Sequence, residues 1–316
     1  MAQTALHPYR IAFFGTPAFA ATVLGHLLDW PGAQVCAAIT QPDRPSGRGQ
    51  RCQPPAVKVL ASEHNIPVLQ PPHLKSQEVQ AQLAALGADL FVVVAYGLIL
   101  PEAVLAIPPL GAFNVHASLL PAYRGAAPIQ RAIQDGCTVT GITIMEMDAG
   151  MDTGPIRLQR SLAIGIDDTA ATLHDELADL GGRLMVEALQ RLAQGRLQRI
   201  PQDEARASYA PKLRKEEGLL SWDRPALSVH NHIRAFHPWP GTWVPWTHGT
   251  RSLRLNILPG RIGEPIPPGT SPGTFLGLQG EALAVACQDR VYLVERLVPQ
   301  GAKPMTGRAF ACGYLN

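Results

Sequence analysis

The first two hundred residues alternate between continuous apolar runs and amphipathic runs, which is the pattern of an α/β domain. An apolar run of strand length predicts a strand covered on both faces, because such a strand exposes no polar side. Strands are expected at residues 9–15, 35–40, 89–96 and 111–116. Helices are expected at residues 18–30, 56–64, 76–86 and 169–195. This alternation predicts a parallel sheet with helices on both faces.

The pattern changes near residue 195. The stretch 196–215 is polar and irregular, which indicates a linker. Beyond it, a short helix is expected at 226–236, followed by short β-like runs separated by Gly and Pro, and these predict a small β barrel. We therefore expect a catalytic domain at 1–195, a linker at 196–215 and a second domain at 216–316.

Composition narrows the class of protein. The 27 basic and 25 acidic residues give a net charge of +2, so no strong overall field points to a nucleic-acid partner, and any basic patch must be local. The five cysteines form no CxxC pair, which argues against a disulfide framework or a structural zinc site. The apolar run 90–100 is too short to span a bilayer, and the start of the chain lacks a signal-peptide pattern. A soluble, cytoplasmic protein without a metal is expected.

Asn114 and His116 come at the end of an expected strand. Residues two apart in a strand project to the same side, and open α/β sheets carry their sites at the carboxyl ends of the strands. An amide and an imidazole together suit the stabilisation of an oxyanion on an attacked carbonyl carbon. The alternative is structural, with the Asn side chain capping a turn and the His side chain hydrogen-bonded in the core.

Two loops offer partners for this pair. Asp148 and Asp152 lie in the Gly-punctuated stretch 145–155, and either carboxylate could fix the tautomer of the imidazole or merely bond within its own turn. The stretch 118–125 offers hydroxyl and main-chain groups that could hold a flat heterocycle, although it could equally be an ordinary loop.

Basic residues gather at two places that could contact a phosphate backbone. The stretch 40–58 is expected to be irregular, and Arg48 stands between two glycines, so this loop is expected to order on a partner. A solvated charged surface is the alternative for both places. The candidates are Arg44, Arg48, Arg51, Lys212, Arg214 and Lys215.

The segment FNVHASLLPAYRGAAPIQRAI, at 113–133, followed by Asp152 in MDAGMDTG, resembles the folate-dependent formyltransferases. Five further motifs narrow the resemblance to the branch of that family that formylates the methionine carried by initiator tRNA. They are FFGTPAFA, TQPDRPSGRG, VVVAYGLILP, YAPKLRKEE and IRAFHPWP. The resemblance runs over nearly the whole chain.

The resemblance implies a Rossmann-like catalytic domain, a C-terminal OB-like barrel that holds tRNA, and 10-formyltetrahydrofolate as formyl donor. It implies Asn114, His116 and Asp152 as the catalytic residues, with Asp152 paired to His116 to support proton transfer. It places Ser118, Leu119, Leu120 and Pro121 in the folate site. It also implies that Arg48 engages the acceptor end of the tRNA, and a monomer that needs no metal is expected.

Four positions depart from the usual family pattern and bear on folate or tRNA contact: Ala122, Tyr123, His237 and Val298. Two other functions stay open. One is another formyltransferase or a formylfolate hydrolase with the same catalytic domain, and the other is a non-catalytic RNA-binding relative. The stretch 40–58 and the C-terminal hundred residues argue against the first. The retained Asn, His and Asp argue against the second.

Overall fold

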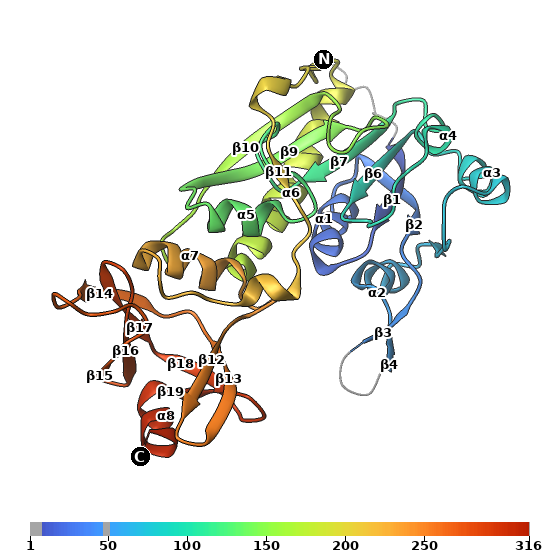
Figure 1. Ribbon diagram of the computed structural model, residues 1–316. Helices are drawn as coiled ribbons and strands as arrows, with labels where there is room; N and C mark the ends of the chain where they lie inside the picture. Colours follow the sequence, from blue (N-terminus) through green and yellow to red (C-terminus); the bar gives the residue numbers. More distant parts are fainter. Residues whose placement is uncertain (1–7, 47–50, 316) are drawn as a thin grey trace. The chain divides into compact units, whose positions relative to one another are not determined.

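The computed structural model describes residues 8–46 and 51–315, and its contacts divide the chain into two compact units (Figure 1). The first unit contains residues up to 125, residues 140–162 and residues 174–209. The second contains residues 126–139, residues 163–173 and the chain from 210 onward. The boundaries predicted at 195 and 215 follow the order of the chain, whereas these units do not, because two earlier segments pack with the C-terminal part.

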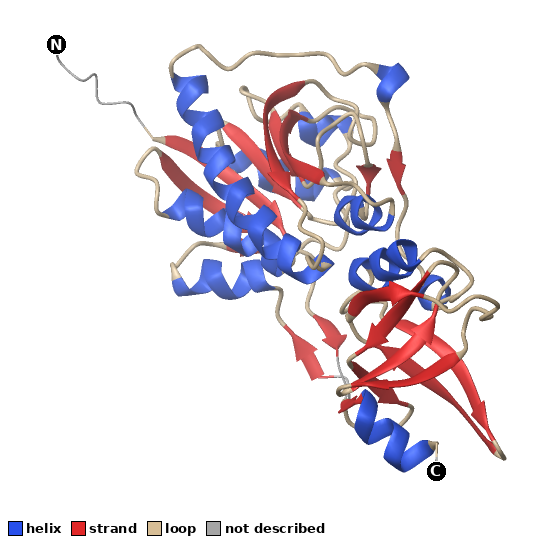
Figure 2. Cartoon of the chain, turned by 90° about the vertical axis from the view of Figure 1, so that its left-hand side faces the viewer, coloured by secondary structure: helices blue, strands red, loops and turns tan. Residues whose placement is uncertain are grey.

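A seven-stranded sheet forms the centre of the first unit, in the order β10-β9-β7-β6-β1-β2-β5. Its strands are β1 (Tyr9–Gly15), β2 (Ala33–Ile39), β5 (Val68–Leu69), β6 (Leu90–Val94), β7 (Ala112–His116), β9 (Val139–Glu146) and β10 (Ile156–Ala163). The side chains of β6 are buried along its whole length, as its apolar sequence predicts. Figure 2 shows helices packed around this layer of strands.

The predicted parallel sheet is confirmed for the five strands from β7 to β5, which pair in parallel. β9 differs, because it runs antiparallel to β7 and pairs Thr143 with His116. The chain between these two strands returns to the carboxyl end of β7, so β9 starts there and runs back. The central sheet is therefore mixed and mainly parallel.

The predicted helices are also present. They are α1 (Ala18–Leu28), α2 (Ala56–Glu63), α3 (Gln77–Ala85) and α6 (Ala170–Ala193), with a short α4 (Glu102–Leu105) in addition. In the described part of the chain, no helix combines the length and the apolar character that a membrane crossing requires.

The stretch 40–58 is more regular than its Pro and Gly content suggested. β3 (Arg44–Ser46) and β4 (Arg51–Gln53) pair antiparallel, with Arg44 opposite Gln53 and Pro45 opposite Cys52. The expectation of an irregular stretch is therefore wrong for these strands. A two-stranded ribbon tolerates Pro45 because a strand without a second neighbour does not need every N–H group for pairing.

The second unit is rich in antiparallel strands, in agreement with the predicted β domain. One sheet has the order β12-β13-β18-β19 and the other β14-β17-β16-β15. Their bounds are β12 (Thr242–His248), β13 (Arg251–Ile257), β14 (Arg261–Pro265), β15 (Phe275–Gln279), β16 (Ala282–Ala286), β17 (Arg290–Val294), β18 (Arg296–Pro299) and β19 (Met305–Thr306). The unit also contains α5 (Pro128–Gln134), α7 (Ala226–Ala235) and α8 (Gly307–Tyr314). Its core includes Ile233, Leu255, Tyr292, Leu297 and Phe310.

Candidate functional site

Asn114 and His116 occupy the carboxyl end of β7, between β6 and β9. Asn114 lies opposite Val93 of β6, and His116 lies opposite Thr143 of β9. His116 is 6% exposed, whereas Asn114 is half-buried. Within the described residues the Asn114 side-chain amide makes no hydrogen bond, so its N–H groups are free to donate to a ligand.

The surroundings of the His116 ring fix the roles of its two nitrogen atoms. Nε2 lies 2.9 Å from the carbonyl oxygen of Tyr123. Because a carbonyl oxygen only accepts, Nε2 carries the proton of the neutral ring, and Nδ1 is left as the basic atom. Nδ1 lies 3.7 Å from Oδ2 of Asp152, which is beyond hydrogen-bond distance. The carboxylate therefore acts on the ring as a nearby negative charge rather than as a direct acceptor.

Asp152 is placed by the backbone of its loop. Its φ of 56° is in the left-handed region, and its Oδ2 accepts a hydrogen bond of 2.8 Å from the N–H group of Gly125. A Cβ atom at Gly154 would collide with the carbonyl oxygen of Glu146, so only glycine fits there. Asp148 instead accepts bonds within its own turn, from the Gly150 N–H group at 3.0 Å and the Thr153 hydroxyl at 2.7 Å. The structure thus brings Asp152 close to His116 and gives Asp148 a turn-forming place.

The segment Ser118–Pro121 is held by hydrogen bonds from the neighbouring strands. The buried Thr143 hydroxyl donates to the Ser118 carbonyl at 2.6 Å and accepts from the Leu120 N–H group at 3.0 Å. Gln159 Nε2 donates to the Leu120 carbonyl at 2.8 Å. The Ser118 hydroxyl donates to the Ala122 carbonyl at 2.6 Å. Most polar groups of this segment are therefore used internally, which makes it a rigid wall rather than a set of free donors.

A loop that supplied a family motif but no predicted site residue lies beside this segment. Residues 95–100 follow β6, which pairs with β7, so both loops lie at the same edge of the sheet. The Tyr96 carbonyl accepts from Thr16 and Gln41, at 3.0 Å and 2.9 Å, and this anchors the loop. Within the part of the chain that the structure describes, the N–H and C=O groups of residues 97–99 take part in no backbone hydrogen bond. A flat heterocycle with amide-like edges could pair with these groups. The sequence signal that could have pointed to this loop is that it follows a strand predicted to lie next to β7 in a parallel sheet.

Two family models match the chain. The formyl transferase model matches residues 9–189, and the model of the formyl transferase C-terminal domain matches residues 212–315. The chain belongs to the formyl transferase family.

Members of the formyl transferase family resemble the chain over nearly its whole length. It is 52% identical over 317 residues to the methionyl-tRNA formyltransferase of Nitratidesulfovibrio vulgaris, covering 100% of this chain and 96% of that one. It is 50% identical over 306 residues to the methionyl-tRNA formyltransferase of Pseudomonas paraeruginosa, covering 96% and 95%. An N-formyltransferase structure from Helicobacter canadensis, in complex with folinic acid and dTDP-3-aminofucose, has a TM-score of 0.64 at 18% identity and covers 94% of this chain and all of that one. That likeness shows the fold alone.

The candidate tRNA-binding cations of this formyl transferase differ in their surroundings. Lys212, Arg214 and Lys215 are exposed, and the Arg214 Nε lies 3.8 Å from a carboxylate oxygen of Glu217. In the antiparallel pair of β3 and β4, Arg44 is exposed on β3 and Arg51 belongs to β4. Arg48 lies outside the described residues.

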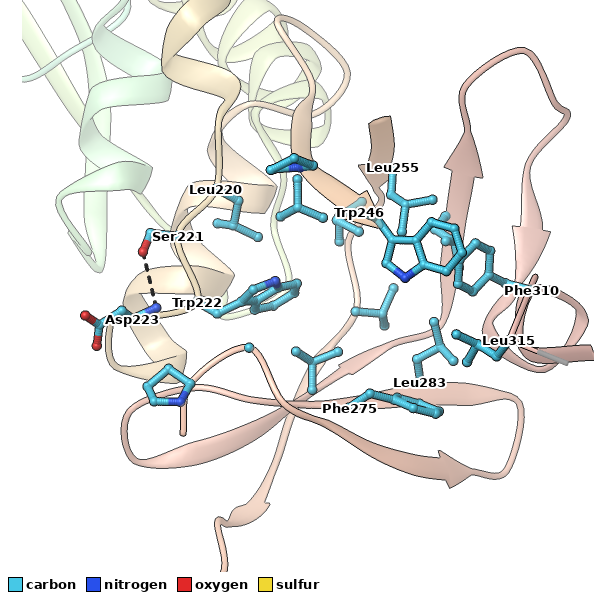
Figure 3. A pocket seen from close by; sticks show the side chains of 18 residues that line it. Leu220, Ser221, Trp222, Asp223, Trp246, Leu255, Phe275, Leu283, Phe310 and Leu315 are labelled. Carbon is cyan, nitrogen blue, oxygen red and sulfur yellow. Dashed lines mark hydrogen bonds between the residues drawn. The ribbon is translucent and has the colours of Figure 1, made fainter. Parts of the chain in front are cut away.

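A cavity of about 440 Å³ lies within the second unit of this formyl transferase and is lined mainly by apolar side chains (Figure 3). Trp222, Trp246, Phe275 and Phe310 surround it, and none of the candidate site residues lines it. Among the described residues, no cluster of three or more His, Cys, Asp or Glu side chains could hold a metal ion.

Proposed function

We propose that the chain transfers the formyl group of 10-formyltetrahydrofolate to the α-amino group of the methionine carried by initiator tRNA. One observation carries this proposal: the chain is about half identical, over both domains, to proteins named methionyl-tRNA formyltransferases. The juxtaposition of Asn114, His116 and Asp152 supports a catalytic rather than a merely RNA-binding role. We propose a cytoplasmic monomer whose C-terminal domain holds the tRNA.

The two loops at the carboxyl edge of β6 and β7 fit the formyl donor. Residues 97–99 offer the ring edge backbone groups that make no backbone hydrogen bond to the described residues, and Ser118–Pro121 provide the rigid wall beside it. The bound donor supplies the formyl carbon that the methionine amine attacks. Asn114 then donates a hydrogen bond to the formyl oxygen as negative charge grows on it.

His116 handles the proton. When the His116 ring is neutral, its Nε2–H group donates to the Tyr123 carbonyl, so Nδ1 carries no proton. Nδ1 can therefore accept the proton that the attacking amine must lose. The Asp152 carboxylate stabilises the resulting imidazolium, whose Nδ1–H group donates a hydrogen bond to the oxyanion. When the bond from the formyl carbon to the donor nitrogen breaks, that one Nδ1 proton is transferred to the departing nitrogen. Asp152 does not need to become protonated.

The test uses the purified chain with 10-formyltetrahydrofolate and initiator Met-tRNA, with elongator Met-tRNA and a panel of small amines as competing acceptors. We expect formylation of the initiator tRNA. Asn114→Ala and His116→Ala should each lower kcat by about a hundredfold or more and leave tRNA affinity nearly unchanged. Transfer to a small amine with none to Met-tRNA would support another formyltransferase. Absence of any formyl transfer would support an RNA-binding relative.

We further propose that two basic clusters contact tRNA. The first comprises Arg44 of β3, Arg51 of β4 and Arg48, which comes between these strands in the sequence. The second lies at the start of the C-terminal domain and comprises Lys212, Arg214 and Lys215. Arginine can pair bidentately with phosphate or stack on a base, so Arg48→Lys should lose part of the activity although it keeps the charge. Equal formylation by the parent, Arg48→Lys and Arg48→Ala would leave the first cluster without a role in tRNA recognition.

A further inference from the structure

Residues 200–208, which we call the strap, follow α6 within the stretch predicted to be a linker. At one end, Ile200 and Ile156 exchange two backbone hydrogen bonds, of 2.8 Å and 2.9 Å. At the other end, the Ser208 hydroxyl accepts from the Tyr123 N–H group at 2.9 Å, and the Ser208 carbonyl accepts from the Arg124 N–H group at 2.8 Å. The strap therefore bonds to the strand that follows the Asp152 loop and to the turn whose carbonyl meets His116.

Gln202 lies in the middle of the strap and uses every hydrogen-bonding position of its amide. Its Nε2 donates to the carbonyl oxygens of Asp152, at 2.8 Å, and Gly154, at 2.7 Å. Its Oε1 accepts from Arg124 Nε at 3.1 Å and Nη2 at 2.9 Å. Because carbonyls only accept and a guanidinium only donates, the reversed amide would mismatch all four contacts. Gln202 thus joins the Asp152 loop to Arg124 in one orientation.

Arg124 is the other anchor of this network. Its side chain is fully buried, and its two terminal nitrogens donate to the Glu204 carboxylate of the strap at 2.8 Å and 2.7 Å. These bonds raise the pKa of Arg124, so the guanidinium stays charged. Arg124 stands between Tyr123, whose carbonyl accepts from His116, and Gly125, whose N–H group holds Asp152. The hydrogen bonds among Gln202, Arg124 and Glu204 therefore restrain the backbone next to the groups that contact His116 and Asp152.

We propose that Gln202 is a positioning residue for formyl transfer, which fixes the Asp152 carboxylate relative to the His116 ring. The proposal rests on the function proposed above. The 3.7 Å separation is set by backbone placement, since Oδ2 and Nδ1 are too far apart to hold each other by a hydrogen bond. Two hydrogen bonds from Gln202 restrain the backbone of that loop at Asp152 and Gly154. Their loss loosens this backbone, and the hydrogen bond from the Gly125 N–H group alone does not fix the Asp152 carboxylate at its distance from the His116 ring.

Gln202→Glu and Gln202→Leu test this role, with the exposed Gln198→Leu as the matched control. Glutamate keeps an acceptor for Arg124 but turns a negative oxygen toward two carbonyl oxygens, so it breaks the Asp152 side alone. We expect both Gln202 variants to lower kcat about tenfold or more, since small misplacements of reacting groups are costly. The KM values for both substrates should stay within about twofold of the parent, because no group that touches a substrate is altered.

Two readouts separate positioning from general destabilisation. First, the loss should appear in kcat while the KM values stay near those of the parent, because the chemical step and not substrate binding depends on the placement of Asp152. Second, Asp152→Asn combined with Gln202→Leu should lose no more activity than Asp152→Asn alone, because Gln202 acts through Asp152. Thermal unfolding shows which variants are folded, and Gln202→Glu serves if Gln202→Leu unfolds.

Two results would overturn the role of the strap. Losses that multiply in the double variant would show that Gln202 acts independently of Asp152. Gln202 variants with the parent kcat would show that the hydrogen bonds are dispensable. A parent chain that transfers no formyl group would instead refute the proposed function and this proposal with it, whereas an active parent with unaffected variants refutes only the proposal on Gln202.

Discussion

Replacing Thr143 by valine should destabilise the fold and weaken binding of the formyl donor. The two side chains have nearly the same shape, so the change removes the hydroxyl while keeping the packing. That hydroxyl is fully buried and serves three groups: the Ser118 carbonyl, the Leu120 N–H group and the Gln159 amide. The first two belong to buried residues and lose a partner in the interior, whereas the side chain of the exposed Gln159 can bond to water instead.

The size of the destabilisation follows from the two buried backbone groups that lose their partner, the Ser118 carbonyl and the Leu120 N–H group. Each buried unsatisfied group costs about 1–3 kcal/mol, so Thr143→Val should lower the free energy of unfolding by about 2–6 kcal/mol. For a unit of this size that corresponds to a Tm lower by roughly 4–24 °C. A loss of about 1 kcal/mol in the anchoring of Ser118–Pro121 would raise the KM for 10-formyltetrahydrofolate about fivefold. The KM for Met-tRNA should not change.

Thr143→Ser is the matched control, because it keeps the hydroxyl and removes one methyl group. It should cost about 1 kcal/mol and leave the donor KM near the parent value. Urea unfolding followed by fluorescence and steady-state formylation kinetics measure the two effects. A Thr143→Val variant as stable as the parent, or one no less stable than Thr143→Ser, would refute the reasoning.

Three further outcomes follow from the structure. Asp152→Asn should lower kcat by about a hundredfold or more, whereas Asp148→Asn should be milder, and the reverse order would contradict the pairing with His116. Burial lowers the pKa of His232 from 6.5 to about 4, so between these pH values the unfolded chain binds a proton on this residue that the folded chain does not. The free energy of unfolding should therefore fall by up to about 3 kcal/mol as the pH drops from 6.5 to 4. His232→Leu should flatten that fall in urea titrations. Changing Lys212 and Lys215 together to alanine should reduce the salt slope of tRNA binding by about one unit for each lysine that pairs with a phosphate, and an unchanged slope would remove them from the interface.

The sequence by itself determined the features that depend on local patterns. Apolar runs and amphipathic runs place the strands and helices because burial repeats with the period of each element. The same period of two places Asn114 and His116 on one side of a strand end, and both lie in β7. The motifs around them were sufficient to recognise the family. All these signals lie within a few neighbouring residues or a single element.

Only the tertiary structure decided which distant groups meet. The residues alone left Asp148 and Asp152 as equal candidates, and the resemblance favoured Asp152. Its position depends on the N–H group of Gly125, 27 residues away, and on Gln202, 50 residues away. The direction of β9 and the pairing of β3 with β4 likewise depend on how the backbone returns, which hydrophobic periodicity does not record. The stretch predicted as a linker looked featureless for the same reason: polar residues such as Gln202 gain their role from partners that folding brings to them.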